Sequence, residues 1–164
     1  MDTQGTADAR QSRGANGVLD DLSKRIIEQL QVDGRRSYAS IAKDVGLSEA
    51  AVRQRVQRLV ETGAMQIVAV TDPLQVGFQR QAMIGVQCSA DPVVLADQIA
   101  QIEAVDYVVV TAGRFDLLVE VVCADDAELL DLVSHRIRSL PEVERSEIFV
   151  YLKLVKQHYD WGTR

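Results

Sequence analysis

The sequence lacks any long run of apolar residues. A helix needs about 18 to 20 consecutive apolar residues to span a bilayer, and no segment of the 164-residue chain approaches that length. The first 17 residues also lack the apolar stretch of a secretory signal peptide. We therefore expect a protein of the cytoplasm that has no membrane partner.

Groups that would carry metal or catalytic chemistry are sparse. The two cysteines, Cys88 and Cys123, stand in apolar runs without the close Cys/His spacing of a zinc site, so we expect buried free thiols. The two histidines, His135 and His158, belong to no Ser/His/Asp or Cys/His grouping, and no glycine-rich phosphate loop occurs. These absences predict a protein that is not an enzyme and that holds no metal and no cofactor.

Charge is distributed unevenly along the chain. The formal net charge is −6, but residues 1–72 carry ten basic and ten acidic residues, so the excess of negative charge lies in the C-terminal part. Residues 35–58 contain six bases and only two acids. A locally basic segment beside an acidic remainder is typical of a DNA-binding module joined to a separate sensing or assembly domain.

Three short helices are predicted in the first third of the chain. Apolar residues recur at helical spacing from Leu22 to Leu30, from Tyr38 to Val45 and from Val52 to Val60. Gly46 permits the left-handed turn that ends the second helix, and Ser48 can cap the third. A short helix, a glycine turn and a further helix predict a helix-turn-helix, whose last helix enters the major groove of DNA.

The outer face of the third helix suits contact with DNA. A small residue permits close approach, amide and guanidinium groups can read base edges, and nearby cations, with Lys43 among them, can contact phosphates. The predicted DNA-binding residues are Arg35, Arg36, Ser48, Ala50, Arg53, Gln54, Arg55, Gln57 and Arg58. A solvated helix of a plain three-helix bundle is the alternative interpretation of this face. The glycine turn favours the helix-turn-helix.

Residues 79–156 have the pattern of a different domain. Apolar alternation predicts four strands, and two helical segments complete the order βαββαβ. This order predicts a ferredoxin-like fold with both helices on one face of a four-stranded antiparallel sheet. Both faces are expected to be apolar, with Val86, Leu118 and Ile148 on the same side. Because an exposed apolar face of that size marks a protein interface, we expect a homodimer joined face to face.

The predicted fold class is α+β with two domains. A segment that is rich in β-branched residues and ends at Asp72-Pro73 separates them. The predicted parts are a flexible arm at 1–17, a winged helix-turn-helix domain at 18–64, a connecting strand or hinge at 65–78, a ferredoxin-like domain at 79–156 and a C-terminal tail at 157–164.

Two stretches of the chain have a distinctive residue pattern. They are LDDLSKRIIEQLQVDGRRSYASIAKDVGLSEAAVRQRVQRLVETGAMQ in the first domain, and TAGRFDLLVEV followed by LPEVERSEIFVYLKLVK in the second. On these stretches the chain resembles the Lrp/AsnC family of feast/famine regulators from Leu19 to about Lys156. The resemblance implies a sequence-specific transcriptional regulator that binds double-stranded DNA in the nucleoid. It also implies a regulation of amino acid metabolism (RAM) domain, whose dimers assemble further into octamers.

The same resemblance implies an effector, an amino acid or a related small metabolite, bound between dimers near the loop that joins the second and third strands. The effector-binding residues that it implies are Gly113, Arg114, Phe115, Asp116, Ser146 and Ile148. A glycine turn can offer N–H groups to a carboxylate, and Asp116 can pair with an α-ammonium. The family often has an acidic or small polar residue in place of Arg114 and a tyrosine in place of Phe115, which leaves the identity of the effector open.

Two alternatives remain open. An architectural protein of the same fold would organise DNA as an octamer without a ligand. An RNA-binding module shares the βαββαβ order, and Gly113-Arg114-Phe115 is similar to its third-strand signature, but the stacking aromatics of that module are missing from this strand.

Overall fold

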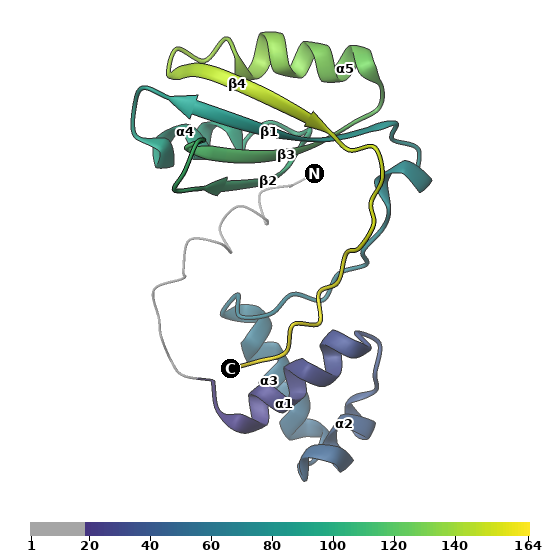
Figure 1. Cartoon of the computed structure of the whole chain (residues 1–164). Helices are drawn as coiled ribbons and strands as arrows, with labels where there is room; N and C mark the ends of the chain where they lie inside the picture. Colours follow the sequence, from purple (N-terminus) through teal and green to yellow (C-terminus); the bar gives the residue numbers. More distant parts are fainter. Residues whose placement is uncertain (1–18) are drawn as a thin grey trace, which may run out of the picture. The chain divides into compact units, whose positions relative to one another are not determined.

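The computed structural model describes residues 19–164 and divides into two compact units (Figure 1). The first unit extends to Ala69 and includes Lys156–Arg164, and the second unit is Val70–Val155. The arm predicted at residues 1–17 lies outside the described residues. Within the described part, no helix has both the length and the apolar character that a membrane span requires.

The first unit contains the three predicted helices. Their bounds are α1 (Asp21–Val32), α2 (Tyr38–Val45) and α3 (Glu49–Glu61). Each helix begins after a side chain, Asp20, Ser37 or Ser48, that accepts a hydrogen bond from a backbone N–H of the first turn. Such caps satisfy N–H groups that no helical carbonyl reaches. Gly46 ends α2 at a φ of 75°, which favours glycine, and the predicted helix-turn-helix is confirmed.

A small apolar core holds the three helices together. Each helix contributes a fully buried side chain to this core: Ile26 of α1, Ile41 of α2 and Val52 of α3. Each such side chain contributes about 1.5 to 3 kcal/mol by leaving water. The C-terminal residues belong to this unit, because the backbone N–H of Gly162 donates to Oε1 of Gln31 at 3.1 Å.

The connection between the units contains no strand where one was expected. Residues 65–70 pair with no other strand in the described part of the chain, and a 3₁₀ turn, η2 (Pro73–Gln75), follows them. The side chains of Ile67 and Val68 are exposed. An extended segment becomes a strand only where a neighbour completes its hydrogen bonds. Residues 19–164 supply no such neighbour, so the expected wing is absent from the described structure as well.

The second unit has the predicted ferredoxin-like architecture. Its elements are β1 (Arg80–Cys88), α4 (Pro92–Ile99), β2 (Val105–Val110), β3 (Leu117–Cys123), α5 (Asp126–Asp131), which continues as a π-helical segment η3 (Leu132–Ile137), and β4 (Val143–Val150). The four strands form one antiparallel sheet in the order β2-β3-β1-β4 (Figure 1). Buried residues of α4, α5 and η3 share one core with the sheet, so the helices cover the same face. The other face carries no helix of this unit, and we call it the open face.

The sheet register corrects the predicted assignment of residues to faces. Ile148 lies opposite Ile84, which is fully buried, so Ile148 is on the helix-covered face together with Val86. Leu118 lies opposite Gly85 and is on the open face. Alternation along one strand gives a period of two but not the phase relative to the next strand. Because both faces are apolar here, composition could not set that phase.

Candidate functional site

The outer face of α3 presents the residue types that DNA recognition requires. Ala50, Arg53, Gln54, Gln57 and Arg58 are all exposed. Among the described residues, the side chains of Gln54 and Arg58 make no hydrogen bond, so an amide and a guanidinium are free on this face. A free amide can bind an adenine edge through two hydrogen bonds, and a free guanidinium can bind guanine or phosphate.

Arg53 is held in place by two neighbours. Its Nη2 lies 2.9 Å from Oε1 of Glu49, and its guanidinium lies 5.2 Å from the centre of the Tyr38 ring. Sequence analysis missed both partners. The spacing of four residues between Glu49 and Arg53 could have indicated the ion pair, whereas the contact with Tyr38 arises only when α2 packs beside α3. Arg53 is therefore engaged by both α2 and α3 while its side chain stays exposed.

Arg55 does not join the exposed face. Its Nη1 donates to Oδ2 of Asp20 at 2.6 Å and to Oγ of Ser23 at 3.1 Å. Arg55 is half-buried and connects α3 to the start of α1. The hydrogen bonds from Ser23, followed by the contact with Arg55, lower the pKa of Asp20 from 3.8 to about 2. The structure thus places Arg55 as a link between helices, on a different side from Gln54.

This link predicts a pH-dependent contribution to stability. The pKa of Asp20 is about 2 in the folded unit, below its ordinary value of 3.8, so its charged form stabilises the fold at neutral pH. That contribution is lost as the pH falls from about 4 towards 2. We expect Asp20→Asn, which keeps the capping oxygen, to lower Tm at pH 6 but not near pH 2. Thermal unfolding across this range checks the prediction, and a difference in Tm that is the same at every pH would contradict it.

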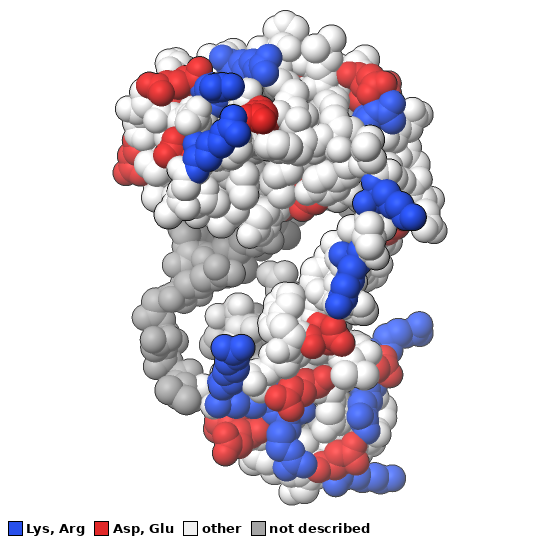
Figure 2. Space-filling view, in the orientation of Figure 1, with Lys and Arg blue, Asp and Glu red and all other residues white. Residues whose placement is uncertain are grey.

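The remaining predicted phosphate contacts lie around α2. Arg36 forms an ion pair with Asp44 and is half-buried, whereas Arg35 is exposed. Ser48 accepts a hydrogen bond from the backbone N–H of Ala51 at 3.2 Å and therefore starts α3. Figure 2 shows Lys and Arg side chains of this unit interspersed with acidic ones. Recognition by this surface would depend on the positions of single groups rather than on a uniform positive charge.

The loop between β2 and β3 forms a compact cluster on the open face. The ring of Phe115 covers Gly85, where an added Cβ would lie 2.6 Å from the ring, and it meets Phe149 edge to face at 6.1 Å. Arg114 stacks on Phe115 at 5.3 Å and pairs with Glu147 at 2.9 Å. We call Arg114, Phe115, Glu147 and Phe149 the loop cluster. It combines two rings with one exposed ion pair.

Asp116 is tied to the strand beside it. Its Oδ2 accepts a hydrogen bond from the backbone N–H of Cys88 at 2.9 Å, and its own N–H donates to the carbonyl of Val86 at 2.9 Å. Gly113, in the same loop, is exposed and has open space where a Cβ would stand. One carboxylate oxygen of Asp116 is therefore already engaged.

The structure does not bring the six predicted effector residues together. Ser146 and Ile148 are on the helix-covered face, where Oγ of Ser146 accepts from Nε of Arg138 at 2.8 Å. Glu147 and Phe149, one position away on β4, occupy the open face beside the loop instead. Sequence analysis missed these two residues because it shifted the phase of β4 by one residue.

The open face is apolar with a polar centre. Met83, Leu118 and Phe149 contribute apolar surface, and Glu120 stands among them with its Oε1 accepting from Nε2 of Gln81 at 2.9 Å. Burial, together with the charge of Glu120, raises the pKa of Tyr151 to about 12. An apolar surface of this kind, which no described element of the chain covers, is typical of an interface.

Comparison with known proteins gives matches over both units. A model of the AsnC-type helix-turn-helix domain matches residues 19–60, and a model of an AsnC-type C-terminal dimeric alpha+beta barrel domain matches residues 78–164. The HTH-type transcriptional regulator FL11 of Pyrococcus furiosus is 32% identical over 146 residues, which are 86% of this chain and 94% of that protein.

Solved structures are similar along the same length. The leucine response regulatory protein LrpA of Mycobacterium tuberculosis has a TM-score of 0.76 at 29% identity, over 85% of this chain and 96% of its own. A transcriptional regulator of Neisseria meningitidis, solved as a complex with L-Met, has a TM-score of 0.73 at 23% identity. The match covers 87% of this chain and 95% of that protein. The latter likeness concerns the fold alone.

Proposed function

The chain belongs to the Lrp/AsnC family of transcriptional regulators, which bind DNA and are not enzymes, and from this premise we propose that it reads a specific DNA sequence as a homodimer and responds to an amino acid or a related small metabolite. The observation that carries the proposal is the exposed face of α3. Ala50 leaves room for a groove wall, and Gln54 and Arg58 offer free groups to bases and phosphates. DNA of the nucleoid is the expected target.

The open face supports the homodimer. The matched C-terminal domain is described as dimeric, and the open face carries apolar side chains, with Phe149 43% exposed. Two copies packed through this face would present two recognition helices about a two-fold axis, as a palindromic operator requires. Further assembly of dimers into octamers is part of the same proposal.

The loop cluster supports an effector with a carboxylate. Arg114 is exposed, and its one ion pair among residues 19–164 is the surface pair with Glu147, so a ligand carboxylate can replace Glu147 at little cost. The other carboxylate oxygen of Asp116 has no hydrogen-bond partner among the described residues and can accept a hydrogen bond from an α-ammonium, and Phe115 and Phe149 offer an apolar wall. The related Neisseria protein was solved with L-Met, an amino acid with an apolar side chain.

The test joins two measurements on the whole protein. DNA sites selected from a random pool should share a palindromic sequence, and fluorescence anisotropy should show tighter binding to this sequence than to scrambled DNA. A thermal-shift screen of the twenty amino acids should find at least one that raises Tm, because a ligand that binds only the native state stabilises it. Selection of DNA together with a flat screen would favour the architectural alternative. Failure to enrich any sequence would overturn sequence-specific recognition.

A further inference from the structure

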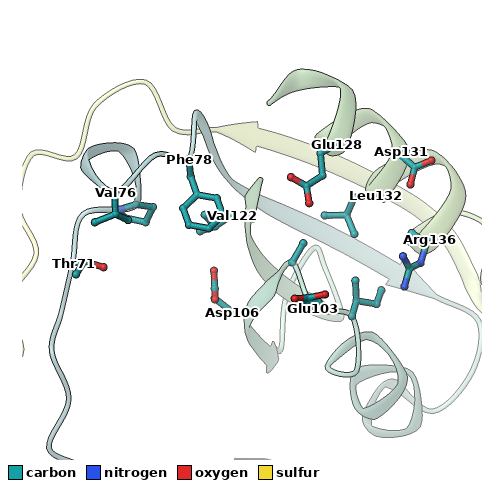
Figure 3. Close-up of a pocket in the computed structure, with 13 residues that line it drawn as sticks. Thr71, Val76, Phe78, Glu103, Asp106, Val122, Glu128, Asp131, Leu132 and Arg136 are labelled. Atoms are coloured by element: carbon teal, nitrogen blue, oxygen red, sulfur yellow. The ribbon is translucent and has the colours of Figure 1, made fainter. Parts of the chain in front are cut away.

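The second unit contains a cavity that the proposed function does not use. Its volume is about 510 Å³, within the range of roughly 300 to 1,000 Å³ that is typical of small-molecule sites. Residues of η2, of the segment that leads into β2, and of α5 and η3 surround it (Figure 3). Phe78, Leu132 and Ile102 are among its apolar lining residues.

The cavity lies at the end of the sheet opposite the loop cluster. Glu103, Ala104 and Asp106 line it at the start of β2, whereas the loop of residues 111–116 follows the last residue of that strand. Five steps along β2 correspond to roughly 17 Å. One small ligand therefore cannot occupy both places.

The ionisable lining of the cavity is mostly acidic. The cavity is lined by one guanidinium, that of Arg136, and by four carboxylates, those of Glu103, Asp106, Glu128 and Asp131. Figure 3 shows Glu103 and Asp106 on one side of the cavity, Glu128 and Leu132 on the other, and Arg136 apart from Asp106. This lining favours a cation over an anion.

Two of the four carboxylates are free to bind a ligand. Glu128 accepts from the backbone N–H of Ala124 at 2.5 Å, and Asp131 lies 3.0 Å from Nδ1 of His135. In the part of the chain that the structure describes, the carboxylates of Glu103 and Asp106 make no hydrogen bond or ion pair. Both residues are exposed in this chain, and partial burial of the carboxyl group, followed by the charge of Glu120, raises the pKa of Asp106. A positive charge placed beside Asp106 would offset both effects.

The spread of the carboxylates argues against a metal ion. Among the described residues, no group of three or more His, Cys, Asp or Glu side chains is arranged to hold a metal. The apolar wall is also unsuited to a hydrated ion, since Phe78 is 42% exposed and Val76 is 56% exposed beside the cavity. A ligand with both a positive group and an apolar part would use the carboxylates and cover these side chains.

We propose that this cavity binds a small organic cation in which an ammonium group is carried on a short alkyl chain. The ammonium binds Glu103 and Asp106, and the alkyl chain lies along Phe78 and Leu132. The site is separate from the amino acid site at the loop cluster and needs no ligand carboxylate.

Isothermal titration of the full chain tests this inference, with 1-aminopentane and 1,5-diaminopentane as probes and pentanoate as the anionic counterpart. We expect saturable binding of one amine per chain and no binding of pentanoate. The double variant Glu103→Gln/Asp106→Asn should weaken amine binding at least about tenfold, because two charge-assisted hydrogen bonds are lost. The matched variant Asp97→Asn/Glu144→Gln removes two exposed carboxylates outside the cavity and should change the affinity by less than about twofold.

Phe78→Ala tests independently whether the apolar wall of the cavity contributes to amine binding. Because Phe78 is partly exposed, the variant should fold, which circular dichroism checks, and it should bind 1-aminopentane several-fold more weakly than the unmodified protein does. Three results would overturn the inference. The first is the absence of saturable amine binding at concentrations up to roughly 10 mM. The others are equal weakening of amine binding in both double variants, and binding of pentanoate as tight as that of the amine. DNA binding is measured on the same samples, so that failure of the amine site and failure of the proposed function are told apart.

Discussion

If the proposed homodimer forms through the open face, Phe149→Asp is expected to leave a monomer and to weaken binding to a palindromic DNA site by at least about a hundredfold. Phe149 is on the open face in edge-to-face contact with Phe115. A carboxylate at this position would be buried without a partner when a second copy packs on the face, which costs several kcal/mol. A monomer binds only one half-site and loses the gain that comes from two linked recognition helices. Sedimentation velocity and fluorescence anisotropy measure the two effects.

Val93→Asp is the matched control for this change. Val93 is on α4 and is 55% exposed, so the same charge is added to the same unit at a position away from the open face. The control should remain dimeric and bind DNA as the unmodified protein does. If Phe149→Asp is folded by circular dichroism and still dimeric, two copies associate through some other surface.

The helices of the first unit could be predicted because their signals are local. Ser37 and Ser48 cap the helices that follow them, and Gly46 has the left-handed conformation that the turn requires. A cap or a turn depends on residues within one helical turn, so a short stretch of the amino-acid sequence is enough to predict it. The link from Arg55 to Asp20 joins positions 35 residues apart, and helical periodicity alone could not distinguish it from an outward arginine.

The sheet could be predicted in its order but not in its phase. The apolar stretches gave the strands, and turn residues gave their limits, yet the register between β1 and β4 depends on packing against the helices. The error in phase changed which residues of β4 were assigned to the candidate effector site. Ser146 and Ile148 were expected beside the loop, where Glu147 and Phe149 stand. A shift of one residue moves every side chain of a strand to the other face.

The cavity had no signal in the sequence for a related reason. Its lining comes from four segments, near Phe78, near Glu103, at Val122 and near Leu132, and no one of them has a binding motif. Residues that meet only after folding can be recognised from the sequence when they share a motif with fixed spacing. These residues share only a place at one end of the sheet.

The second large effect concerns the free amide on α3. Gln54→Ala should weaken binding to the selected DNA site by about 1 to 3 kcal/mol, the contribution of one good side chain to base discrimination. Binding to scrambled DNA should change by less than about twofold, because phosphate contacts provide nearly all of that affinity. The reason lies in the structure, where Gln54 is exposed and makes no side-chain hydrogen bond among the described residues. Its two amide atoms are therefore available to a base.

Two neighbours on the same helix serve as controls. Gln57 is chemically identical, but its Nε2 donates to Oε1 of Glu61 at 2.7 Å, so Gln57→Ala should have a smaller effect on the selected site. Arg58→Ala should weaken both DNAs alike and reduce the slope of log K against log salt by about 1, as the loss of one phosphate contact does. Anisotropy titrations at several salt concentrations separate these outcomes. Equal losses on both DNAs for Gln54→Ala would show that this residue contacts the backbone and that base recognition belongs to other residues of α3.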